Sequence, residues 1–185
     1  MLKERIFFMS KFFKTKNIAA AGILIAAHIV FARILSFESG PFKISLGFLP
    51  VCIGGMVFGP LGGGFIGAVS DLIGCLIFSR GQVYFPLFTL SEFLYGFGFG
   101  IILHKQNRSL LKITLFTAAQ FIILNILLQS CWLYLYYILV LGKQKGLFVL
   151  MSARLTAAAV NLPVQLICVN LISKYLRKPI SNIGR

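Results

Sequence analysis

Residues 59–74 read GPLGGGFIGAVSDLIG, an apolar and glycine-rich run with one carboxylate, Asp71, near its end. Nine of the eighteen glycines of the chain fall within residues 47–74. Glycine lets membrane helices approach closely, so this run predicts a tightly packed helical hairpin that turns at Gly59 and Pro60. An ionised carboxylate in hydrocarbon costs about 2.5–3.5 kcal/mol unless it meets a cation or water. The stretch therefore predicts a membrane protein with a polar contact inside it.

The composition of the whole chain is that of an integral membrane protein. Of its 185 residues, 58% are hydrophobic and 12% are charged, whereas soluble domains carry about 25% charged residues. Apolar runs of the roughly 20 residues that cross a bilayer follow one another with short polar breaks. We expect an all-α integral membrane protein with six transmembrane helices, at about 17–36, 44–58, 61–79, 86–104, 111–141 and 147–176. They form one domain, 17–176, between a basic and aromatic N-terminal tail, 1–16, and a basic C-terminal tail, 177–185.

The net charge of +14 is distributed by membrane side. If the N-terminus is cytoplasmic, twelve of the eighteen basic residues lie inside, four lie outside, and Arg33 and Arg154 lie within spans. This is the positive-inside bias of cell-membrane proteins. It predicts cytoplasmic N- and C-termini, and lipid rather than nucleic acid as the surroundings of the chain.

Motifs for catalysis, nucleotides and metals are missing from the sequence. Gly62, Gly64 and Gly67 match G-x-G-x-x-G but lie between membrane spans, where the motif has no dinucleotide-binding context. No P-loop and no H-E-x-x-H motif occurs, and the four acidic residues are never close together. The sequence predicts no enzyme activity, no cofactor and no metal.

Two spans carry polar stripes. In 111–141 the stripe consists of Asn125, Gln129, Trp132 and Tyr136, and in 147–176 it consists of Arg154, Asn161 and Gln165. Their spacings of three, four and seven residues place each stripe on one helical face. Hydrogen bonding between helices would explain one stripe alone. Two stripes favour a ligand site that opens outward.

Three further features remain open to two interpretations each. Asp71 is expected to pair with one of the arginines within spans, either to order the bundle or to serve a site. Phe85 and Phe88 form either an interfacial belt or a lid over an aromatic ligand. A ridge of small residues on the first span either packs internally or docks another membrane helix, and it consists of Ala19, Gly22 and Ala26.

With these residues in place, the chain resembles the substrate-binding S component of energy-coupling factor (ECF) vitamin transporters, most closely the folate family. The resemblance covers about residues 15–176. It rests on ARILS at 32–36, KISLGFLPVCIGGMVFGPLGGGFIGAVSDLIGCLIF at 43–78, YFPLFTLSEFLYGFGFG at 84–100, LLQSCWL at 127–133 and SARLTAAAVNLPVQ at 152–165.

The resemblance implies a six-helix S component that captures a vitamin outside the cell and is not an enzyme. It would dock on a separate transmembrane T component with two ATPase subunits and topple in the membrane to release its substrate. The ridge on the first span would face the T component, although Gly22 stands where alanine is common.

For a folate, the resemblance and the side-chain chemistry together suggest three sets of contacts. Trp132, Phe85 and Phe88 would stack on the pterin, and Asn125, Gln129 and Asn161 would bind its edges. The carboxylates of the glutamate tail would meet Arg33, Arg154 and Lys43. Asp71 would either contact the pterin edge or orient an arginine. Riboflavin, thiamine or pantothenate on the same scaffold, or a membrane protein without a transport role, are the alternatives.

Overall fold

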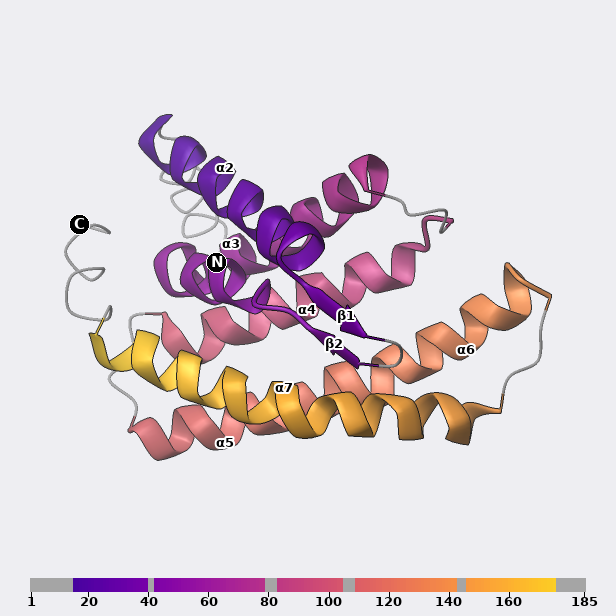
Figure 1. Ribbon diagram of the computed structural model, residues 1–185. Helices are drawn as coiled ribbons and strands as arrows, with labels where there is room; N and C mark the ends of the chain where they lie inside the picture. The colour runs from indigo at the N-terminus through magenta and orange to yellow at the C-terminus, as the bar shows by residue number, and fades with distance from the viewer. Residues whose placement is uncertain (1–14, 40–41, 79–82, 105–108, 143–145, 176–185) are drawn as a thin grey trace, which may run out of the picture.

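The computed structural model describes residues 15–39, 42–78, 83–104, 109–142 and 146–175. These residues are helical apart from one short hairpin (Figure 1). The helices are α2 (Thr15–Ile29) with the π segment η1 (Val30–Ile34), α3 (Phe48–Ile77), α4 (Pro86–Leu103), α5 (Leu110–Phe121), the π segment η2 (Ile122–Leu128), α6 (Gln129–Leu139) and α7 (Leu147–Tyr175). The strands are β1 (Phe37–Ser39) and β2 (Phe42–Ile44).

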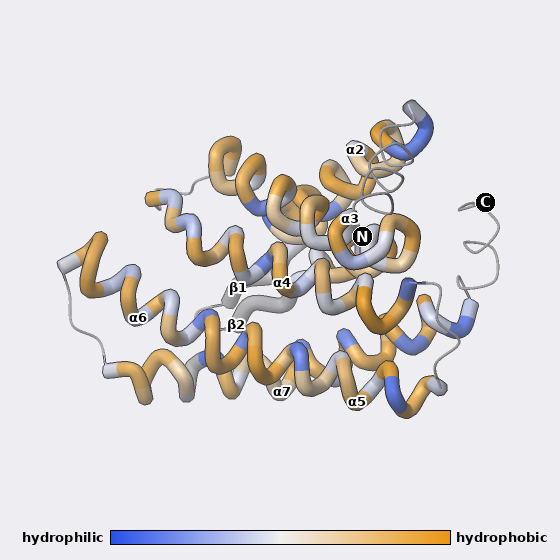
Figure 2. The backbone as a smooth tube through the Cα atoms, turned by 180° about the vertical axis from the view of Figure 1, so that it is seen from behind, coloured by the Kyte–Doolittle hydropathy of each residue, from blue (hydrophilic) through white to orange (hydrophobic). Residues whose placement is uncertain are grey.

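Five segments of this described chain are long and apolar enough to cross a membrane. They are Thr15–Ile34, Phe48–Ile77, Pro86–Leu103, Leu110–Leu139 and Leu147–Tyr175. Apolar residues dominate these segments along their length (Figure 2). The expected all-helical membrane architecture is therefore present, and α3 alone covers the region in which two spans were expected.

Helix α3 is broken at Gly59. Its φ of 78° and ψ of −172° are not helical, and a positive φ of this kind is readily adopted only by glycine. The following Pro60 has no N–H to donate. Beyond the break the chain folds back on itself. The evidence is the closeness of Gly63 to Gly55, since a Cβ placed on Gly63 would lie 2.7 Å from the Gly55 Cα. The predicted turn at Gly59 and Pro60 is thus present as the break between the two arms of α3.

A histidine at the end of α4 forms a hydrogen bond to the backbone at the break. His104 follows the last residue of α4, and its Nδ1 donates to the Met56 carbonyl oxygen at 2.9 Å. Met56 precedes Pro60 by four residues, so a regular helix would leave this carbonyl without a donor. The histidine provides the missing hydrogen bond.

Glycines also bring α4 against α3. A Cβ on Gly63 would lie 2.5 Å from the Gly96 carbonyl oxygen, and one on Gly96 would overlap the Gly63 carbonyl. The buried side chains between these helices include Val51 and Phe99, both fully enclosed. The two arms of α3 and α4 therefore form one closely packed unit.

The hairpin was not expected from the sequence, which placed a span from residue 44 onward. Strands β1 and β2 pair antiparallel, with Phe37 opposite Ile44 and Glu38 opposite Lys43. Strand β2 contacts α7, and the hairpin leads the chain from η1 into α3 (Figure 1). Each strand has only three residues, too few for an alternating pattern to indicate it.

Substitution of Gly96 by alanine is expected to destabilise the fold. The new Cβ would have to push α4 away from α3, and overpacking of this kind costs about 1–3 kcal/mol. Thermal unfolding of the purified protein in detergent should therefore show a lower midpoint for Gly96→Ala. The matched control is Gly22→Ala, because a Cβ there meets no atom within 4 Å. Equal midpoints for wild type and Gly96→Ala would contradict the packing described.

Candidate functional site

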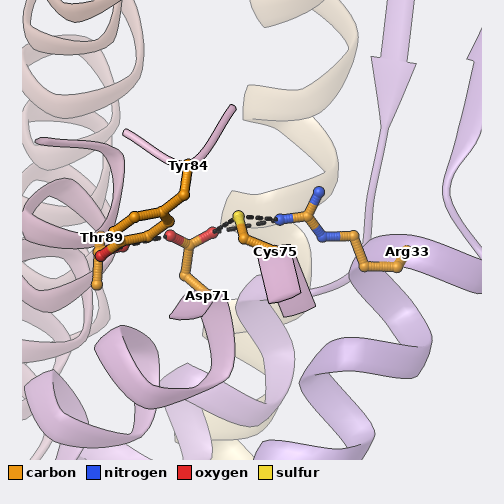
Figure 3. Close-up of polar contacts among 5 residues, drawn as sticks. All are labelled: Arg33, Asp71, Cys75, Tyr84 and Thr89. Atoms are coloured by element: carbon orange, nitrogen blue, oxygen red, sulfur yellow. Dashed lines mark hydrogen bonds and ion pairs between the residues drawn. The ribbon is translucent and has the colours of Figure 1, made fainter. Parts of the chain in front are cut away.

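Asp71 and Arg33 form an ion pair between α3 and the π segment η1 (Figure 3). The distance from Arg33 Nη2 to Asp71 Oδ1 is 3.4 Å, and the side chains are 20% and 13% exposed. The guanidinium passes over Gly74, where a Cβ would lie 3.3 Å from Arg33 Nε. The expected pairing of Asp71 with an arginine is confirmed, and the partner is Arg33.

The second carboxylate oxygen of Asp71 is also bonded. Thr89 Oγ1 donates to Asp71 Oδ2 at 2.8 Å, and the Tyr84 hydroxyl lies 3.0 Å from the same threonine oxygen. Arg33 Nη2 also donates to Cys75 Sγ at 3.0 Å. This outer cluster, Arg33, Asp71, Cys75, Thr89 and Tyr84, therefore joins the end of α2 to α3 and α4 (Figure 3).

Arg154 lies elsewhere and has neutral partners. Its Nη1 donates to Gln129 Oε1 at 2.6 Å and to the Asn125 carbonyl oxygen at 3.5 Å. Its Nε is buried without a hydrogen bond in the part of the chain that the structure describes. A guanidinium held by neutral groups keeps its positive charge available to an anion.

Aromatic side chains at the start of α4 and on α6 pack together. Trp132 Nε1 donates to Ser91 Oγ at 3.0 Å. The Phe85 ring packs on Phe88 and on Tyr136, with centroid distances of 5.6 and 5.7 Å. The first turns of α4 thus contact α3 through the outer cluster and α6 through the tryptophan, which makes α4 the link between the two sides.

A further pair of buried polar side chains, Tyr95 and Gln165, lies one turn of α4 beyond Ser91. The Tyr95 hydroxyl donates to Gln165 Oε1 at 2.5 Å. Tyr95 follows Ser91 by four residues of α4, a rise of about 6 Å, and Asn125 lies about one turn before Gln129 in the π segment η2. The polar stripes therefore continue inward from the arginine and tryptophan contacts.

Both π segments occur at this site. Arg33 lies in η1, and Asn125 lies in η2. π-bulges insert an extra residue into a helix and are frequent at functional sites. Their presence at two of the expected site residues supports a functional role for this region.

The structure brings most of the expected site residues into three groups. Arg33 meets Asp71, Asn125 and Gln129 meet Arg154, and Phe85 meets Phe88 near Trp132 on α4 and α6. Asn161 is half-buried on α7 between Arg154 and Gln165. Lys43 is placed only by its backbone in the hairpin.

Four polar contributors were missed by sequence reasoning, namely Cys75, Thr89, Ser91 and Tyr95. Cys75 follows Asp71 by four residues and so shares its helical face. Ser91 and Tyr95 are likewise four apart. The four-residue spacing was a usable signal, but single serines and tyrosines in apolar spans are common enough to pass unnoticed.

Comparison with known proteins identifies the architecture. The model of the family "ECF transporter, substrate-specific component" matches residues 16–173. The chain belongs to this family. It is a membrane-embedded, substrate-binding component of a transporter, which agrees with the apolar helices of the structure.

Two similar proteins are curated as folate transporters. This S component is 34% identical to the folate transporter FolT of Clostridium novyi (strain NT) over 146 residues, 79% of this chain and 81% of that protein. It is 26% identical to FolT of Leuconostoc mesenteroides subsp. mesenteroides over 124 residues, 66% of each. A solved structure described as FolT bound with folic acid matches with a TM-score of 0.76 and 34% identity, over 87% of this chain and 94% of that one.

The contact between Arg154 and Gln129 gives a prediction for the ligand-free S component. Gln129→Leu should lower its thermal midpoint in detergent, because hydrogen bonds to charged groups contribute about 1.5–3 kcal/mol and Arg154 would stay half-buried. Gln129→Glu retains an acceptor and should unfold at or above the wild-type midpoint. A leucine variant as stable as the wild type would show that this contact is not needed.

Proposed function

We propose that this S component binds folate from outside the cell and delivers it through an ECF T component and two ATPase subunits, as part of an ABC-type importer. The observation that carries the proposal is the match to FolT bound with folic acid at 34% identity over nearly the whole of that chain. The site chemistry agrees with it, because the chain carries two part-buried arginines and a group of packed aromatic rings.

The two ends of folate have different requirements, and the clusters suit both. The pterin is flat, so Trp132, Phe85 and Phe88 would stack on it. Its polar edges would meet Asn125, Gln129 and Asn161. The glutamate carboxylates would meet cations, because charge-assisted pairs with arginine are strong and directional. The proposed cations are Arg33, Arg154 and Lys43.

Asp71 is proposed to orient Arg33 rather than to bind the pterin. Each of its carboxylate oxygens already has a partner, Arg33 on one side and Thr89 on the other. A carboxylate occupied in this way holds the guanidinium in one orientation. It also lowers the cost of placing either charge in the membrane.

The proposed topology has six spans with both termini in the cytoplasm. The arms of α3 on either side of Gly59 would count as two spans, in line with the close approach of Gly55 and Gly63. An even number of spans places both ends of the chain on one side. The basic residues of the tails, all but Lys16 outside the described residues, favour the cytoplasmic side.

The ridge of Ala19, Gly22 and Ala26 on α2 is proposed as the docking surface for the T component. All three residues are exposed, and a Cβ on Gly22 would meet no atom within 4 Å. A smooth surface of small side chains lets another membrane helix approach closely. Packing among the described residues does not use the ridge at Gly22.

Vitamin binding by the purified chain tests the proposal. Isothermal titration in detergent, without ATP and without partner subunits, should show saturable binding of folic acid. Riboflavin, thiamine and pantothenate, titrated in the same way, should not bind. Saturable binding of one of these vitamins in place of folic acid would still agree with a vitamin-binding S component but would contradict folate as its substrate.

Loss of the Asp71 charge should weaken binding without preventing membrane insertion. We expect Asp71→Asn to lower folic acid affinity about tenfold, equivalent to about 1.4 kcal/mol, because Arg33 loses its fixed orientation. Calorimetry on the purified variant measures this. Ser70→Ala, next to Asp71 on α3 and bonded to the Ile66 carbonyl oxygen of the same helix, is the control. Unchanged affinity in Asp71→Asn would remove Asp71 from the site.

A bulky residue in the ridge should block assembly and leave binding intact. Gly22→Leu is expected to abolish co-purification with the T component and ATPases, since the leucine side chain holds the helices apart. Its folic acid affinity should match the wild type. Ile23→Leu, at an adjacent exposed position, is the control and should assemble normally. Normal assembly of Gly22→Leu would place the docking surface elsewhere.

A further inference from the structure

A buried amide on α7 has hydrogen-bond donors that no described residue satisfies. Gln165 is only 2% exposed, and its Nε2 has no partner in the part of the chain that the structure describes. The other end of the amide is fixed, because the Tyr95 hydroxyl donates to Gln165 Oε1 at 2.5 Å. An unsatisfied buried N–H is unfavourable, so an acceptor supplied by a ligand would be stabilised there.

Tyr95 is itself held in place and so orients the amide. Its ring packs edge-on against Phe99 at a centroid distance of 4.9 Å, and its backbone carbonyl accepts from Gln120 Nε2 at 2.6 Å. The Tyr95 hydroxyl donates its proton to Gln165 Oε1, so the amide oxygen already accepts a hydrogen bond. The NH₂ group of Gln165 is the part of the amide that no described residue accepts from.

The depth of this amide relates it to the site already described. Tyr95 is one helical turn, about 6 Å, beyond Ser91, which bonds Trp132. Asn125 is one turn from Gln129, which bonds Arg154. The amide therefore lies beneath the tryptophan and arginine contacts, at the end of the site that the leading part of a ligand would reach.

We infer that Gln165 selects for the oxygen at the 4-position of the pterin ring, an inference that rests on the proposed binding of folate. In folic acid this position carries a carbonyl, a hydrogen-bond acceptor that the Gln165 NH₂ can meet. In the 4-amino-4-deoxy analogue, aminopterin, the same position carries an NH₂ donor. Two donors facing each other leave both unpaired, which is how a site rejects a ligand of nearly the same size and shape.

The test compares these two ligands on the purified chain in detergent by calorimetry. The wild-type chain should prefer folic acid over aminopterin by about tenfold or more. Gln165→Glu replaces the donors with an acceptor and should abolish or reverse the preference. Gln165→Met has a similar volume and no donors, so its two affinities should become nearly equal. Should the charged variant fail to fold, the methionine variant alone decides.

Two further variants separate recognition from a structural effect. Tyr95→Phe leaves Gln165 unchanged but frees its amide to turn, so it should narrow the preference. Asn170→Asp is the matched control on α7, because the Asn170 amide is already bonded to Thr114 at 2.8 Å. It should change both affinities by the same factor.

The outcomes distinguish the inference from the proposed function. Folic acid binding with the same preference in wild type, Gln165→Glu and Gln165→Met overturns the role of Gln165 and leaves folate binding in place. Absence of folic acid binding to the wild-type chain overturns the proposed function itself.

Discussion

Close backbone packing through glycine is the constraint on which the rest of this structure depends. Gly63 lies against both Gly55 and Gly96, so the two arms of α3 and helix α4 approach to distances that no larger residue allows. Lipid gives apolar helices little reason to associate, and tight van der Waals contact replaces the hydrophobic effect as the driving force. The Gly59 break creates the geometry, and His104 satisfies the carbonyl that Pro60 leaves without a donor.

This packed unit places polar groups at fixed positions in an apolar medium. Asp71 on α3 and Thr89 on α4 meet because their helices are held together, and their contact in turn fixes Arg33. Helices α6 and α7 carry the opposite set, with Arg154 held by neutral groups. Among the residues that the structure describes, Arg33 is paired with a carboxylate and Arg154 is held by neutral groups, an asymmetry suited to an anionic ligand.

Much of this could be predicted from the sequence, because hydrocarbon leaves few choices for a polar side chain. The glycine-rich run with Pro60 predicts the turn at Gly59, and the energetic cost of a carboxylate in hydrocarbon predicts that Asp71 pairs with an arginine. The helical spacing of polar residues predicts the polar faces at Asn125 and Arg154. The choice of Arg33 over Arg154 as the partner could not be predicted, since it depends on the π segment at the end of α2. Nor could the short hairpin, whose second strand lies against α7.

The most direct test of the account is the structure of this S component with folic acid bound. The account predicts one ligand between the two sets of helices, with its ring near Trp132 and its carboxylates within hydrogen-bond distance of Arg154 or Arg33. A folic acid molecule bound away from both arginines and from Trp132 would contradict the claim that these polar clusters form a single vitamin site.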